Sequence, residues 1–270
     1  MDLRPLAPAE IGELSAAGCR SADWSQVRVA PAFAVQGRLR EVEFSGWVEL
    51  GVFNAELPDL GGRTRPTGVF FSSLHNVSLA DDSLVRHSDL VNVRVGKGAW
   101  VNRVGLLAGE GESHFANGQE VKVLSEDGTR SVPLWRRLSA TLAHILCRRR
   151  GRREAEALRE LMARDWTSLA SDCSWVGPGA RVERSGRLSN IYLEEGARLD
   201  GVAELFDCYV ASSLASPACL GAGVTARRVV FQRSSHTQGG VSLENCLVGE
   251  GTRLENGFSA EESLFFANSH

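Results

Sequence analysis

Aliphatic residues recur at every sixth position in two long stretches of the chain. The recurrence is clearest in two triplets, Val176, Val182 and Leu188 followed by Leu193, Leu199 and Leu205. Shorter copies occur upstream, in the pair Leu79 and Val85 and the pair Val95 and Val101. A strand alternates every second residue and a helix repeats about every 3.6 residues, so neither explains this period. A fixed period of short units predicts a solenoid in which each repeat stacks on its neighbours.

Glycine recurs at one phase of this repeat, three positions after the aliphatic residue. The glycines concerned are Gly98, Gly179, Gly196, Gly223 and Gly251. Corners between short strands often require a positive φ, which glycine adopts without steric cost. A strand and a corner repeated in this way would build a three-sided coil, whose aliphatic residues point inward. A β-sandwich with glycine-rich turns is the alternative, but it does not explain the constant phase.

We therefore predict a mainly β fold, a parallel β-helix with one elongated core. The residues expected to face this core are Val95, Val176, Val182, Leu188, Leu193, Leu199, Leu220, Val248 and Leu254. The periodicity predicts four regions. Residues 1–41 form an N-terminal helix near Pro8–Ala17 and an extended lead-in, and residues 42–131 form a first block of coils. Residues 132–171 form a helical insertion, and residues 172–270 form a second block that ends in mid-repeat.

The insertion is predicted because the hydrophobic period changes there. Leucines at helical spacing replace the six-residue pattern, and we expect a hairpin of two helices that adds no strand to the coils. Its inward positions are predicted to be Leu138, Leu142, Leu158 and Leu161. A second interruption, Ser212 to Cys219, is expected to be a loop. The basic run from Arg148 to Arg153 is interpreted as a solvated turn between the helices, since acidic residues follow it at once.

Charge and composition exclude several classes of function. The formal net charge of −3 gives no global basic field for nucleic acid. No run of about 18 apolar residues occurs, so we expect no membrane association. The six cysteines lie far apart without a Cys-x-x-Cys pair, which indicates reduced thiols in a cytoplasmic protein and no metal site. Walker, Gly-x-Ser-x-Gly and His-Glu-x-x-His motifs are missing as well.

Several segments resemble large bacterial hexapeptide-repeat proteins that are classed only as a domain of unknown function. The segments are Pro8-Ala-Glu-Ile, Gly18-Cys19, Asp23-Trp24, Phe44-Ser-Gly, Gly111-Glu-Ser-His-Phe-Ala-Asn-Gly, Arg137-Leu-Ser-Ala and Phe258-Ser-Ala-Glu-Glu-Ser-Leu-Phe-Phe-Ala-Asn268. The resemblance implies a left-handed β-helix of the trimeric acyltransferase-like superfamily, and therefore a homo-oligomer, expected to be a trimer. It implies no established activity.

The resemblance also directs attention to histidines, because hexapeptide acyltransferases use a coil histidine as general base. Three stretches break the six-residue pattern and are candidate ligand sites: residues 112–117, 232–238 and 256–268. His236 and Glu261 are the predicted catalytic residues, with Asn268 beside them. The predicted substrate-binding residues are His114, Asn117, Asn256 and Asn268. The alternative is that these side chains only cap turns by bonding to the backbone.

Three functions remain open from the sequence. The first is an enzyme, acyltransferase-like or nucleotidyltransferase-like, that acts on a sugar-linked substrate. The second is a non-catalytic β-helix that binds a sugar or nucleotide-sugar, and the third is an oligomerisation module. No resident cofactor is indicated; coenzyme A or a nucleotide-sugar is expected as a substrate.

Overall fold

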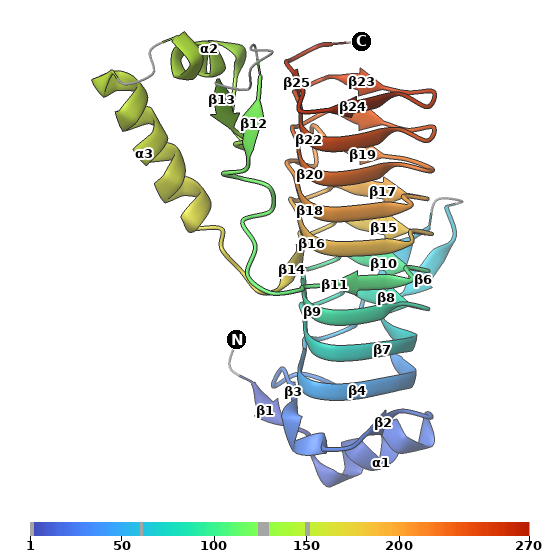
Figure 1. Ribbon diagram of the computed structural model, residues 1–270. Coiled ribbons are helices and arrows are strands. Elements are labelled where there is room, and N and C mark those ends of the chain that lie inside the picture. The colour runs from blue at the N-terminus through green and yellow to red at the C-terminus, as the bar shows by residue number, and fades with distance from the viewer. Residues whose placement is uncertain (1–2, 60–61, 124–129, 149–151, 270) are drawn as a thin grey trace.

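The computed structural model describes residues 3–59, 62–123, 130–148 and 152–269, most of which lie in a tall stack of strands (Figure 1). Within these residues the main sheet links 21 strands. All its pairings are parallel except that of β1 (Arg4–Pro5) with β3 (Val27–Val29). Inner strands pair with strands of the preceding and the next coil, as β15 does with β10 and β17. The fold is therefore mainly β and β-helix-like.

The strands of the stack fall into two groups. One ladder consists of β8 (Leu84–Arg86), β10 (Trp100–Asn102), β15 (Arg181–Glu183), β17 (Arg198–Asp200), β19 (Cys219–Leu220), β21 (His236–Thr237) and β23 (Arg253–Leu254). The remaining faces are built by β4 (Leu39–Leu50), β7 (Gly68–Leu79), β9 (Asp89–Val95), β11 (Leu106–Ala108), β14 (Ser174–Val176), β16 (Arg187–Leu193), β18 (Glu204–Val210), β20 (Thr225–Phe231), β22 (Ser242–Val248), β24 (Ser259–Glu261) and β25 (Leu264–Phe265).

The core runs along the inside of the stack. All nine residues predicted to face inward are buried in one continuous cluster, so that prediction is confirmed. The parallel register explains the cluster, because Val182 pairs with Val101 below and Leu199 above. Burial raises the pKa of the Cys208 thiol to about 12, so this core cysteine is a packing group rather than a reactive one.

The N-terminal segment closes one end of this core. The predicted N-terminal helix is α1 (Pro8–Ala16). It lies across the end of the stack (Figure 1), and its Leu14 side chain is fully buried. The short strand β2 (Arg20–Ser21), the turn η1 (Trp24–Gln26) and β3 follow, and β2 and β3 both pair with β4. The coils therefore begin before residue 42, where we had expected the first block to start.

The interruption of the stack is longer than the sequence indicated. Strands β11 and β14 belong to one coil, since each pairs with both β9 and β16. The chain leaves the stack between them, and we call residues 109–173 the excursion. We had expected coils as far as residue 131, but β12 (Glu120–Lys122) pairs with β13 (Ser131–Pro133) in an antiparallel hairpin. A strand of the stack and a strand of a separate hairpin both alternate every second residue. The sequence pattern therefore does not reveal which of the two sheets a strand joins.

Two helices complete the excursion. Helix α2 (Ala140–Arg148) begins after Ser139, whose Oγ accepts a hydrogen bond from the backbone of Leu142 at 3.4 Å, and α3 (Arg153–Thr167) follows. Residues 149–151 of the basic run lie outside the described residues. Leu161 is 58% exposed, so the expectation that it faces inward was wrong. No helix among the described residues has the length and apolar character required to cross a bilayer.

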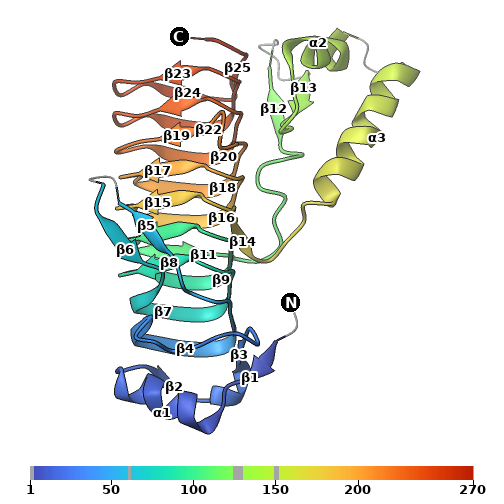
Figure 2. The ribbon, with the colours of Figure 1, turned by 180° about the vertical axis from the view of Figure 1, so that it is seen from behind.

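A second apolar core joins the excursion to the stack. Tyr192, Tyr209, Val230 and Leu247 occupy one outward column on β16, β18, β20 and β22. They pack with residues of the excursion, including Leu134 and Leu138 between β13 and α2, and Met162 in α3. The excursion consequently stands beside the C-terminal half of the stack (Figures 1 and 2).

Candidate functional site

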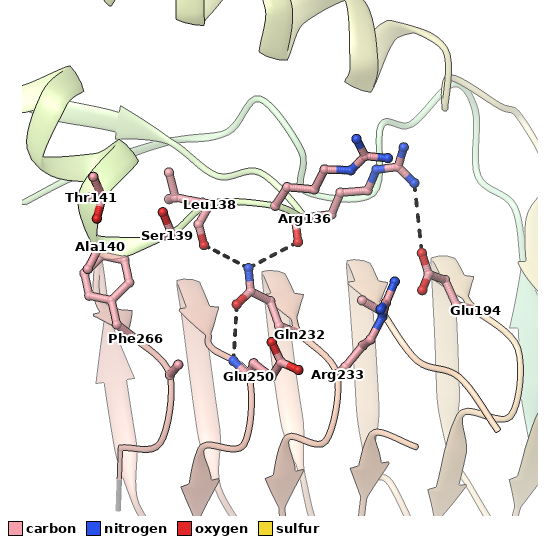
Figure 3. Close-up of a pocket in the computed structure, with 13 residues that line it drawn as sticks. Arg136, Leu138, Ser139, Ala140, Thr141, Glu194, Gln232, Arg233, Glu250 and Phe266 are labelled. Atoms are coloured by element: carbon pink, nitrogen blue, oxygen red, sulfur yellow. Dashed lines mark hydrogen bonds and ion pairs between the residues drawn. The ribbon is translucent and has the colours of Figure 1, made fainter. Parts of the chain in front are cut away.

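A large cavity lies where the excursion meets the stack, and we call it the junction cleft (Figure 3). Its volume is about 580 Å³. One wall is the segment 136–141, and the other is a row of corners that follow the strands β16, β18, β20, β22 and β25. The lining residues are Arg136, Arg137, Leu138, Ser139, Ala140, Thr141, Glu194, Ala211, Gln232, Arg233, Glu250, Phe266 and Ala267.

The coil register aligns the polar groups of the second wall. Leu193, Val210, Phe231 and Val248 pair in line on successive coils. The first residues after these strands therefore form one column, which contains Glu194 and Gln232, and the second residues form another, which contains Arg233 and Glu250. Neighbouring coils of a parallel sheet are about 4.8 Å apart, so side chains on them are held at set distances.

Gln232 ties the two walls together. Its Nε2 donates to the backbone oxygens of Arg136 at 3.1 Å and Leu138 at 2.9 Å. Its Oε1 accepts from the backbone nitrogen of Glu250 at 3.2 Å (Figure 3). Every polar atom of this amide is thus used to fix backbone, and Gln232 shapes the cleft rather than presenting a free group to a ligand.

Arg136 holds α3 against the stack by hydrogen bonds to both parts of the structure. Its Nε and Nη2 donate to the carboxylate of Asp165 at 2.9 and 2.8 Å, and its Nη1 donates to the Tyr209 hydroxyl at 3.1 Å. That hydroxyl donates to Glu194 at 2.5 Å, and Trp135 Nε1 donates to Asp165 at 2.7 Å. The hydrogen bonds from Arg136 lower the pKa of Asp165 to about 2, while burial raises the pKa of Tyr209. The hydrogen-bonding groups of these side chains are therefore occupied by one another.

Three charged groups of the cleft remain available to a ligand. The side chains of Arg137, Arg233 and Glu250 are exposed, and none makes an ion pair or side-chain hydrogen bond with another described residue. The cleft therefore offers two guanidinium groups beside a carboxylate. Guanidinium groups bind phosphate and carboxylate oxygens in pairs, whereas carboxylates accept hydrogen bonds from hydroxyl groups.

The predicted catalytic pair is not brought together. His236 lies in β21, where its inward neighbour Thr237 pairs with Leu220 and Leu254. Glu261 lies in β24, which pairs with β22 on another face. Both side chains point outward from different ladders, and neither lines the junction cleft. Asn268 follows β25 at a corner with φ of 61°, where its backbone nitrogen donates to Glu250.

The predicted substrate-binding residues occupy other corners. His114 and Asn117 line a separate cavity of about 380 Å³ at the start of the excursion. The amide of Asn117 donates to the backbone oxygens of His114 and Phe115 and accepts from the backbone nitrogen of Arg136, which favours a structural role. Asn256 has a φ of 61° at the corner after β23, a conformation that asparagine tolerates.

Sequence reasoning missed most residues of the junction cleft. It marked the stretch Gln232–Gln238 as a break in the pattern, and Gln232 and Arg233 do line the cleft. Arg136 and Arg137 were hidden in a segment expected to be helical. Glu194 and Glu250 follow repeat strands and resemble ordinary solvated corner residues, because their partner wall lies far away in the sequence.

Comparisons with known proteins do not assign chemistry to this cleft. One family model, described as a domain of unknown function, matches residues 3–270. No curated protein matches the chain.

Proposed function

The chain belongs to the DUF4954 family, a domain of unknown function. For this member of the family we propose that the junction cleft binds a sugar or nucleotide-sugar. The observation that carries the proposal is the unpaired set of Arg137, Arg233 and Glu250 around one cavity. Arginine pairs suit the phosphates of a nucleotide-sugar, and carboxylates suit sugar hydroxyls. Phe266 adds an apolar surface at one end. A cleft of about 580 Å³ also has the size of ordinary small-molecule sites.

Binding without turnover is the version that we favour over a transferase. None of the described lining residues is a histidine or cysteine. His236, the candidate general base, belongs to another face of the stack. A transferase acting here would need Glu250 to accept the proton of the attacking hydroxyl. An acyl-coenzyme A or a nucleotide-sugar would supply the transferred group, and the coenzyme A thiol or the nucleoside diphosphate would leave. That version is retained as the second candidate.

The test is ligand binding to the full chain, measured by calorimetry with UDP-glucose, UDP and coenzyme A as probes. We expect a nucleotide-sugar to bind and Arg233→Ala to weaken it about tenfold or more, because a charged hydrogen bond is lost. Arg253→Ala is the matched control, since Arg253 is an exposed arginine on the β23 ladder. Equal affinity in the two variants, or no binding by any probe, would contradict the proposal. Hydrolysis or transfer during the titration would favour the transferase.

We also propose that the coils are left-handed hexapeptide coils and that the chain forms a homotrimer, as the resemblance to the acyltransferase-like superfamily implies. The regular corners support the hexapeptide repeat, because four successive coils place Asn190, Asp207, Arg228 and Asn245 at one position with φ between 48° and 53°. Sedimentation equilibrium should then give three times the chain mass of 29.2 kDa. A monomer at micromolar concentration would overturn the trimer, and right-handed coils in a crystal structure would overturn the handedness.

A further inference from the structure

A second polar cavity lies on another face of the stack, under a hairpin that the proposed function does not use. Strands β5 (Glu56–Pro58) and β6 (Thr64–Pro66) leave the stack between β4 and β7 and lie beside β8, β10 and β15 (Figure 2). Arg181 anchors the hairpin, because its Nη2 donates to the backbone oxygen of Pro58 at 2.6 Å. Its guanidinium also lies 4.5 Å from the ring centroid of Trp100.

This cavity, which we call the hairpin site, has a volume of about 280 Å³. It is lined by Asp59, Arg65, Leu84, Arg86, His87, Trp100, Asn102, Arg103, Glu183 and Arg184. The parallel register stacks Arg86, Asn102 and Glu183 in one outward column. His87, Arg103 and Arg184 follow them at the next corner, with φ of 48°, 56° and 49°. Three successive coils thus direct cationic residues to one place.

The charges of the hairpin site are not balanced. Four arginines and two carboxylates are among its described lining residues. Glu183 is buried and already shared, lying 3.4 Å from Arg181 and 3.9 Å from Arg184. Arg86 and Arg103 make no ion pair with any described residue. Two adjacent guanidinium groups without a counter-charge repel each other, and an anion between them would remove that repulsion.

Buried donors of the same site also lack acceptors. The Nε atom of Arg86 and the Nε1 atom of Trp100 are buried and have no hydrogen-bond partner. Trp100 as a whole is only 3% exposed. Nearly all buried donors in folded proteins are satisfied, so two orphan donors beside one cavity need an explanation. An oxyanion is the group that accepts several N–H bonds at once and carries the missing charge.

We propose that the hairpin site binds a phosphate-type oxyanion, either inorganic phosphate or the phosphate of a small monoester, between Arg86 and Arg103. Trp100 closes one side of the site and the β5–β6 hairpin covers it. Partial burial and the charges of Arg86 and Arg103 lower the pKa of His87. A bound anion offsets those charges and therefore raises the pKa of the His87 imidazole.

The test uses the full chain with inorganic phosphate as the probe, compared with sodium chloride at equal ionic strength. Phosphate should raise the thermal midpoint, and the His87 pKa measured by proton NMR should rise. The double variant Arg86→Gln/Arg103→Gln should lose both effects. Arg253→Gln and Arg233→Gln should keep them, which separates this site from nonspecific charge and from the junction cleft. A merely structural arginine pair would not move the His87 titration.

Each outcome has a consequence for the proposal. A phosphate effect no larger than that of chloride, or one that survives in the double variant, overturns it. Loss of the effect in Arg233→Gln alone would place the anion in the junction cleft and overturn the hairpin site. Comparison of phosphate with glycerol 3-phosphate at equal concentration identifies the source, since tighter binding of the ester indicates a monoester. Should the double variant unfold, Arg103→Gln alone, at an exposed corner, provides the same comparison.

Discussion

Leu193→Ala lowers the free energy of unfolding by about 2–5 kcal/mol, the range observed when a buried leucine leaves a cavity. Leu193 has no exposed surface and stacks between Val176 and Val210 of the adjacent coils. Its backbone oxygen accepts from Gly177 at 2.8 Å, so the ladder holds the strand in place. Because the ladder on each side is continuous, the coils cannot move inward to fill the void, and we expect the upper half of the range.

Urea unfolding followed by circular dichroism measures this loss. Leu214→Ala is the matched control, because the Leu214 side chain is 67% exposed in the loop between β18 and β19. Its expected change lies within about 0.5 kcal/mol, as is usual for surface positions. Similar losses in both variants would show that Leu193 is not part of a tightly packed core.

Arg136→Ala should release the excursion from the stack while leaving the coils folded. The change removes both hydrogen bonds to Asp165 and one to Tyr209. Breaking a fully buried pair costs about 3–5 kcal/mol, and exposed pairs cost under about 1 kcal/mol. The side chains of Arg136 and Asp165 are 20% and 18% exposed, so we expect an intermediate cost of about 2–3 kcal/mol.

Hydrogen exchange locates the effect of Arg136→Ala. Protection should fall in β12, β13, α2 and α3 and persist in β16 through β22. Arg159→Ala is the control, because its pair with Glu120 is 34% and 46% exposed and should contribute little. Unchanged hydrogen exchange in the excursion of the Arg136→Ala variant would show that Arg136 does not hold the excursion against the stack.

Acid should loosen the same contact. The pKa of Asp165 is about 2 in the folded chain, below its ordinary value of 3.8, because Arg136 donates to the carboxylate. A depressed carboxylate pKa stabilises the fold above about pH 4, and this contribution is lost as the pH falls from about 4 to about 2. Fluorescence of Trp135, which also donates to Asp165, should change over that interval. The component should be missing in Asp165→Asn.

The stacked core could be predicted because it depends only on local spacing. An inward residue at every sixth position and a glycine three places later are properties of each coil, whichever coil lies next to it. The continuous cluster containing Val176, Val182 and Leu188 follows from that spacing. Helix α1 could be placed for a similar reason, since Pro8 and Gly18 mark its ends locally.

The position of the excursion could not be obtained in this way. Tyr209, Val230 and Leu247 lie in strands that are apolar on both faces. Such strands indicate that something covers their outer face, but not which segment does so. The covering residues, Leu134 and Leu138 among them, are distant in sequence and became recognisable only when both columns were seen in contact.

The repeat, the inward residues and the existence of an interruption can be derived from the sequence alone, because each depends on short-range periodicity. The location of the candidate site depends on tertiary contacts. His236 and Glu261 are near in sequence, yet the coil turns direct them to different faces. Gln232 contacts the backbone of Arg136, 96 positions away, and this contact creates the junction cleft. The physical reason is that a coil fixes the direction of each side chain, whereas a cleft requires two segments that the repeat does not relate.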